Sequence, residues 1–186
     1  MTKKRKAKIS NDIPPQKLIA GVKEETINSE IYKQWDITFD LSFRGCFYSI
    51  DEKEFNNCFK NTEEFVQMYK NCMITLHKLS GHTIYELLSN KSFRHCHEVK
   101  KEDEKKAYKI IKKLCEKVEL SESYFEQNVG SEKIYQIGFE DSVRIFGTIR
   151  ANIFRVFFID YFHHFYFDEG KNERNIKNYN FCPMSN

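Results

Sequence analysis

Two apolar runs on either side of Ala151-Asn152 constrain the fold of this chain most strongly. The runs, residues 142–150 and 153–160, are separated by two residues, and Asn tolerates the left-handed backbone that a tight hairpin turn needs. The segment 133–139, "KIYQIGF", reads as a further strand, followed by a turn at 140–142. We therefore predict an antiparallel β-meander at the C-terminal end of the domain.

The position of this turn decides which side chains share a face of the hairpin. Residue 150 would pair with 153, 148 with 155, and 146 with 157. One face would then be wholly apolar and buried in the core: Val143, Ile145, Gly147, Ile149, Phe154, Val156 and Phe158. The other face would carry Arg144, Phe146, Thr148, Arg150, Ile153, Arg155 and Phe157.

This second face combines arginines with aromatic rings. Guanidinium groups bind phosphates and aromatic rings stack on bases, so an exposed face of this kind suits nucleic acid. We predict that Arg144, Arg150 and Arg155, with Phe146 and Phe157, contact RNA or another nucleic acid. The alternative is that a helix buries the two phenylalanines and that the arginines pair with acidic residues.

Chemically reactive side chains follow this hairpin directly. Asp160, His163 and Tyr166 are spaced three apart, and histidine is the side chain that changes charge near neutral pH. We predict His163 as acid or base, Asp160 as the residue that orients it, and Tyr166 as a supporting donor, with Arg144 stabilising charge. The alternative is a strand end whose polar side chains have a structural role.

The segment "RHCHEV" supplies a second group of polar side chains. Arg94 and His97 would join the site on folding, Arg94 as a phosphate ligand and His97 as a catalytic residue. His95 and His97 would share one face of a strand, a spacing open to metal ligation. Because no third or fourth ligand stands nearby, we expect no metal and no cofactor.

The rest of the chain reads as one strand and a group of helices. Residues 35–43 alternate without a fault, with Trp35, Ile37, Phe39, Leu41 and Phe43 on one face, which predicts a half-buried strand. Helical spacing covers 61–80, 83–88 and 101–118, with a loop or short strand at 92–99 between the last two. We predict an α+β fold with one N-terminal strand, two to three helices and a C-terminal antiparallel β-meander packed on the helices.

The net charge of +3 is concentrated at the N-terminus, in Lys3, Lys4, Arg5, Lys6 and Lys8. Without these five, 25 of the 30 Lys and Arg remain against 27 Asp and Glu, so the body is near neutral. We expect a flexible basic arm and linker at 1–30, a single domain at 31–168, and a loose polar tail at 169–186. The arm either solvates the terminus or binds nucleic-acid phosphates.

The six cysteines contain no CxxC pair, and no apolar segment is long enough for a signal peptide or a membrane span. We expect reduced thiols, a cytoplasmic location and no membrane association. Besides nucleic acid, a protein or a nucleoprotein is the other kind of partner that we expect.

Several of these motifs together resemble a known family. They are "FDLSF", "FRHCHEV", "RIFGTIRANIFRVFFID" and Asp-x-x-His-x-x-Tyr, within residues 35–167. This combination is similar to an uncharacterised family of small proteins from low-GC bacteria, mycoplasmas and their mobile elements. Its chains often open with a basic, proline-containing arm, as "KKRK" and "IPP" do here. They usually carry Trp ahead of the Asp and Pro after it, where this chain has Phe158 and Tyr161.

The last strands also resemble the RelE/ParE toxin superfamily, in which helices precede an antiparallel sheet with arginines on its central strands. This resemblance implies an RNA-acting, metal-independent ribonuclease of toxin type. Two alternatives stay open at this point. One is a non-catalytic nucleic-acid- or nucleoprotein-binding module of a mobile element or defence locus. The other is a protein-interaction inhibitor or adaptor.

Overall fold

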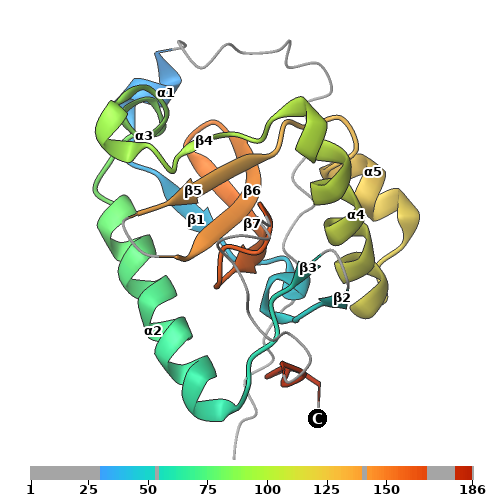
Figure 1. The fold of residues 1–186 in the computed structure, drawn as a ribbon. Helices are drawn as coiled ribbons and strands as arrows, with labels where there is room; N and C mark the ends of the chain where they lie inside the picture. Colours follow the sequence, from blue (N-terminus) through green and yellow to red (C-terminus); the bar gives the residue numbers. More distant parts are fainter. Residues whose placement is uncertain (1–29, 53–54, 140–141, 167–178, 186) are drawn as a thin grey trace, which may run out of the picture.

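The computed structural model describes residues 30–52, 55–139, 142–166 and 179–185. A five-stranded mixed sheet with the order β1-β7-β6-β5-β4 forms the centre of the fold, with α2 on one side and α4 and α5 on the other (Figure 1). The strands of this sheet are β1 (Thr38–Asp40), β4 (His97–Glu98), β5 (Tyr135–Gly138), β6 (Arg144–Arg150) and β7 (Ile153–Asp160). The α+β class predicted from the sequence is confirmed.

The other elements are short, apart from two helices of 17 and 18 residues. A small second sheet pairs β2 (Asp51–Glu52) with β3 (Phe55–Asn56). The helices are α1 (Ile31–Gln34), α2 (Thr62–Leu79), α3 (Ile84–Ser89), α4 (Lys101–Lys117) and α5 (Glu122–Asn128). The residues that the structure describes also contain the 3₁₀ turns η1 (Arg44–Phe47) and η2 (Lys91–Phe93).

The predicted helices begin where their capping residues stand. Asn61 accepts a hydrogen bond from the Glu64 backbone N–H at 2.9 Å, and Thr83 and Glu86 form a complete capping box at the start of α3. In α4 the side chains of Ala107, Ile110, Ile111 and Leu114 are buried. The sequence analysis did not predict α5. Among the described residues, no helix is long and apolar enough to cross a membrane.

The C-terminal meander β5-β6-β7 is antiparallel, and its hairpin turn is where the sequence placed it. Arg150 pairs with Ile153 across Ala151-Asn152. The left-handed backbone falls on Ala151, with φ of 53°, rather than on the asparagine. Asn152 instead donates from its side chain to the Asp36 carbonyl at 3.0 Å, which joins the turn to the chain entering β1.

A β-bulge changes the predicted register further from the turn. Gly147 pairs with Val156 but Phe146 pairs with Phe158, so Phe157 is the extra residue. The predicted pairing of 146 with 157 is therefore wrong, and Phe158 shares a face with Phe146, not with Val143. Glycine is required at 147, because a Cβ there would collide with the Arg155 carbonyl oxygen.

Away from its turn, the central hairpin is buried on both faces, which contradicts the prediction of an exposed arginine and aromatic face. Phe146 and Phe157 expose none of their surface. Phe146 stacks on Phe158 with ring centroids 4.4 Å apart, and Phe157 packs edge-on against Phe43 at 5.2 Å. Neither ring can stack on a base, because elements on both sides of the sheet cover them.

The N-terminal strand is shorter than predicted. β1 pairs in parallel with β7, Thr38 opposite Ile153. Trp35 lies outside the strand and exposes 61% of its surface, so the prediction that it belongs to the buried face is wrong. The strand is short because Asp36 forms its bridge with Thr83 instead, and because Asp40 turns the chain by accepting the Ser42 backbone N–H at 2.9 Å.

Residues 179–185 contact the domain, contrary to the expectation of a loose tail. Phe181 and Phe59 exchange both of their backbone hydrogen bonds, each 2.9 Å long. Asn56 donates from its side-chain amide to the Tyr179 carbonyl at 3.1 Å. The basic arm predicted at 1–30 lies outside the described residues, apart from its last residue.

Candidate functional site

The candidate site lies at one end of the sheet, where the four strands β4, β5, β6 and β7 bring polar residues into register. Asp160 of β7 stands opposite Arg144 of β6, and Arg144 opposite Gly138 of β5. One register step away, Gln136 of β5 stands opposite His97 of β4. Residues far apart in the sequence therefore meet along one edge.

The Arg144 side chain lies flat across Gly138. Its guanidinium group is almost fully buried, donates from Nη1 to the Val143 carbonyl at 2.8 Å, and places Nη2 3.1 Å from Nδ1 of His95. A Cβ at position 138 would stand 2.9 Å from Cδ of Arg144 and 3.2 Å from Nη1. Arg144 can therefore adopt this position only because residue 138 has no side chain.

His95 sits between two guanidinium groups. Nε of the exposed Arg94 donates to its Nε2 at 3.2 Å, while Arg144 approaches its Nδ1. Burial lowers the pKa of His95 to about 4, and the charges of Arg144, Arg94, His163 and His97 add to this. His95 is therefore neutral at pH 7. The charges of Arg144, Arg94, His163 and His97 all disfavour protonation of its ring.

A neutral imidazole has one N–H and one acceptor nitrogen. Only one of the two ring nitrogens of His95 can therefore accept a hydrogen bond from an arginine. At the other nitrogen, the imidazole N–H faces the N–H of a guanidinium group, and both are donors. An anion placed beside the ring would accept from both the imidazole N–H and a guanidinium group. The arrangement is chemically suited to a phosphate oxygen.

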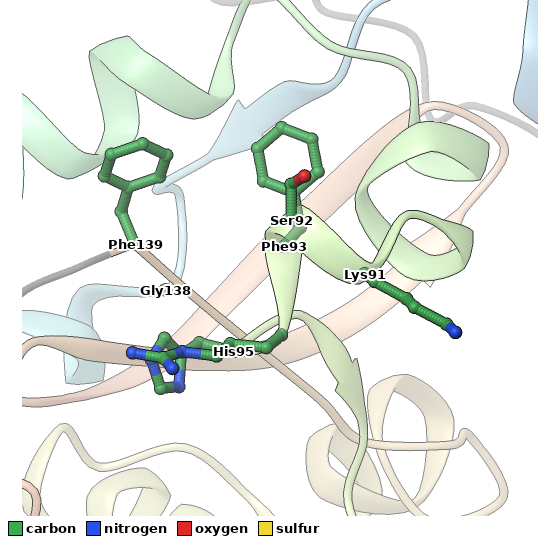
Figure 2. A pocket seen from close by; sticks show the side chains of 7 residues that line it. Lys91, Ser92, Phe93, His95, Gly138 and Phe139 are labelled. Carbon is green, nitrogen blue, oxygen red and sulfur yellow. The ribbon is translucent and has the colours of Figure 1, made fainter.

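A pocket of about 270 Å³ opens beside His95 (Figure 2). Figure 2 shows the Phe93 and Phe139 rings on one side of it and His95 on the other. Nζ of Lys78 lies 4.5 Å from the centroid of the partly exposed Phe139 ring. The pocket is lined by Lys91, Ser92, Phe93, Arg94, His95, Gly138 and Phe139.

The combination of cations and aromatic rings that the sequence analysis expected on β6 and β7 thus occurs at a different place, the η2 turn and the end of β5.

His97, predicted as catalytic, is held by both of its ring nitrogens. Nδ1 lies 2.9 Å from the Glu98 carbonyl oxygen and Nε2 3.2 Å from the side-chain amide of Gln136. These contacts are satisfied together when Nδ1 carries the proton. Gln136 also donates to the His95 carbonyl at 3.1 Å, so its side chain holds the segment that runs from His95 into β4.

Asp160 differs in its contacts from the prediction. It is fully buried, and its carboxylate accepts three backbone hydrogen bonds, from Phe162 and His164 on Oδ1 and from Phe165 on Oδ2. It shapes the turn that follows β7 and does not orient the His163 ring by a hydrogen bond. His163 occupies the tip of this turn, partly exposed, with a left-handed φ of 61°.

The neighbouring residues of the turn have structural contacts. His164 is buried and its Nδ1 lies 2.7 Å from the Asn56 carbonyl oxygen. Tyr166 has a buried hydroxyl without a hydrogen-bond partner in the described part of the chain. Burial, together with the charges of Asp103, Asp160 and Glu102, raises its pKa to about 12, so the phenol stays protonated. Its ring centroid lies 6.2 Å from that of His163.

The other two predicted nucleic-acid-binding arginines form ion pairs away from the pocket. Arg155 binds Asp40 at 2.7 Å from Nε and Asn128 at 2.9 Å from Nη1. Arg150 binds Glu132 at 2.7 Å on the surface. The alternative left open by the sequence, pairing with acidic residues, describes both. Lys3, Lys4, Arg5, Lys6 and Lys8 lie outside the described residues.

No group of three or more His, Cys, Asp or Glu in the described ranges could hold a metal ion.

Comparison with known protein families finds one match for this chain. The family model described as "Uncharacterised protein UU032" matches residues 42–186. The chain belongs to this family. The uncharacterized protein UU032 of Ureaplasma parvum serovar 3 is 27% identical over 151 residues, which are 80% of this chain and 81% of that protein.

The matched region contains the pocket, the meander and the C-terminal segment. No solved structure matches the chain. The predicted resemblance to an uncharacterised family is confirmed, whereas nothing in the comparisons supports the resemblance to RelE/ParE toxins.

Sequence reasoning missed the central place of His95 and the parts played by Gln136, Gly138 and Phe139. Gly138 carried a usable signal, since a glycine inside an apolar strand often marks close approach of another group. The neighbour that approaches it could not be named without the register of β5 against β6.

Proposed function

We propose that this protein binds single-stranded RNA at the pocket and cleaves it without a metal ion. The observation that carries the proposal is the neutral His95 ring between two guanidinium groups, with His163 close enough to influence its pKa. Arg94 would bind a phosphate, the buried guanidinium group of Arg144 on the other side of His95 would add positive charge, and the Phe139 ring would stack on a neighbouring base.

Cleavage of RNA requires few groups. A base removes the proton of the 2′-hydroxyl, its oxygen attacks phosphorus, and an acid protonates the departing 5′-oxygen. In this proposal His163 moves the proton, because it stands partly exposed at the tip of a turn. The two guanidinium groups stabilise the charge that develops on the phosphorane. The products would carry a 2′,3′-cyclic phosphate and a 5′-hydroxyl.

The test uses a labelled single-stranded RNA, incubated with the protein with and without EDTA, and analysed on denaturing and native gels. The variants are His163→Ala and Arg94→Met, with Arg150→Met as the matched control, since Arg150 is also exposed but pairs with Glu132. We expect cleavage in EDTA, at least 100-fold slower cleavage in His163→Ala, and about 10-fold weaker binding in Arg94→Met only. Unaltered cleavage by folded His163→Ala protein would refute the catalytic role.

A second candidate is RNA binding without cleavage. It is favoured by the contacts of Asp160 and by the buried Tyr166 hydroxyl, because neither residue takes the catalytic role predicted for it. A gel shift that depends on Arg94, with intact RNA, would establish this candidate. Removal of residues 1–8 then tests the basic arm: a contribution to binding would flatten the salt dependence, and an unchanged slope would exclude it.

A further inference from the structure

Two cysteines face each other where the C-terminal segment meets the domain. Phe59 and Phe181 form an antiparallel pair that exchanges both backbone hydrogen bonds. In an antiparallel ladder the next position is a non-hydrogen-bonded pair, with Cα atoms about 4.5 Å apart. Cys58 and Cys182 occupy that position. A Cα separation of this size lies within the range that disulfides span.

The two thiols share one environment. The Ser49 backbone N–H donates to Sγ of Cys182 at 3.3 Å, and the Ser49 side chain interacts with both cysteines. Burial raises the pKa of Cys58 to about 11, and the charges of Asp51 and Cys182 add to this.

The two thiols are not equivalent. Burial raises the pKa of Cys182, but hydrogen bonds from Ser185, Ser49 and Met184 outweigh it and hold the pKa below its ordinary value. Cys182 therefore ionises first and is the better nucleophile of the pair. Both side chains are buried.

We propose that Cys58 and Cys182 are a redox-sensitive pair that hydrogen peroxide converts into an intramolecular disulfide. The Cys182 thiolate attacks peroxide, the O–O bond breaks, and a sulfenic acid and hydroxide form. The Cys58 thiol then attacks the sulfenic sulfur, the S–O bond breaks, and the departing hydroxide takes the Cys58 proton to give water. Both sulfurs are oxidised by one electron each, and one peroxide is reduced to two molecules of water once the first hydroxide is protonated.

The disulfide would connect the C-terminal segment to the part of the chain that supports the turn of His163. The Asn56 carbonyl oxygen accepts from Nδ1 of His164 at 2.7 Å, and the Asn57 side-chain amide donates to the Ile159 carbonyl at 2.8 Å. Oxidation would thus hold the residues beneath this turn in place. The inference does not depend on the proposed function, because it rests on the strand register and the shared Ser49.

The experiment treats the full-length reduced protein with hydrogen peroxide, blocks remaining thiols with N-ethylmaleimide, and maps tryptic peptides by mass spectrometry without reduction. The relevant peptides are 54–60 and 178–186, each with a single cysteine. We expect these two linked, in more than half of the molecules, and separated again by dithiothreitol. Cys115→Ala is the matched control, because Cys115 is equally buried in α4 and lies in neither of these two peptides, and it should leave the link unchanged.

Thermal unfolding gives a second readout. Closing a loop of more than 100 residues should raise the Tm of the oxidised wild-type protein by roughly 5 °C or more, and the Cys58→Ser variant should show no rise. Linkage of Cys182 to any other cysteine would overturn the proposal. So would oxidation of Cys182 to sulfinic acid while Cys58 remains open to N-ethylmaleimide, or the absence of any peroxide-dependent change in wild-type protein.

Discussion

The low pKa of His95 makes the stability of the fold depend on pH in a defined direction. Between its ordinary pKa of 6.5 and its folded value of about 4, the unfolded chain binds a proton at His95 that the folded chain does not. The contribution to stability is complete above pH 6.5 and is lost as the pH falls toward 4. The full difference corresponds to at most about 3.4 kcal/mol, and because the ring is partly exposed, solvent screening reduces it to about 1–2 kcal/mol.

The assay is urea denaturation of wild-type protein, His95→Gln and His77→Gln at several pH values from 7.5 to 4.5. Carboxylates with lowered pKa, such as Asp40 and Glu86, also reduce stability in acid, but they do so in every variant and cancel in the comparison. We expect wild type and the exposed-surface control His77→Gln to lose about 1–2 kcal/mol more than His95→Gln. Equal losses in all three proteins would refute the placement of a neutral His95 between two cations.

Three further substitutions test separate contacts. Gly138→Ala should displace the Arg144 guanidinium group and weaken RNA binding about 10-fold. Gly81→Ala is the control and should bind RNA like the wild type, because a Cβ at position 81 would meet nothing within 4 Å. Equal RNA binding by both variants would contradict the packing of Arg144 on Gly138. Arg155→Met should lower the free energy of unfolding by about 1–2 kcal/mol, because the ion pair with Asp40 is lost, and should retain the affinity for RNA. A loss of RNA affinity at unchanged stability would support the predicted nucleic-acid role of Arg155. Asp160→Asn should destabilise the fold by about 2–4 kcal/mol, because a neutral amide cannot replace a carboxylate that accepts three backbone N–H groups; denaturation curves that superimpose on wild type would exclude this.

The fold was predictable where one local signal decided the outcome. The caps at Asn61 and Thr83 marked two helix starts, and the two residues between the apolar runs marked the hairpin turn. The bulge at Phe157 was not predictable, because it depends on the contact of Gly147 with the opposite strand. One inserted residue moved Phe158 to the other face, which is the sensitivity expected of a period of two.

The site was predictable in its composition more than in its arrangement. Arg144, His163, Arg94 and His97 do come together at one end of the sheet, and their residue types alone suggested this. The ion pairs of Arg150 and Arg155 could not be assigned from the sequence, because their acidic partners come from the loop before β5 and from β1. Their role in nucleic-acid binding stays a prediction. Parity along a strand tells which side a residue faces, but not which distant segment covers that side.

The parallel pairing of β1 with β7 has a consequence for how the chain reaches its native state. Asp40 and Arg155 are 115 residues apart, so the sheet closes only by a contact of very long range. Strand pairings of this kind require a large loss of chain entropy before the stabilising contacts form, and they therefore slow folding. During synthesis the first strand must wait, unpaired, until nearly the whole domain has been made. Refolding of this protein should therefore be slow for its size, and an early stop before residue 153 should leave a chain prone to aggregation.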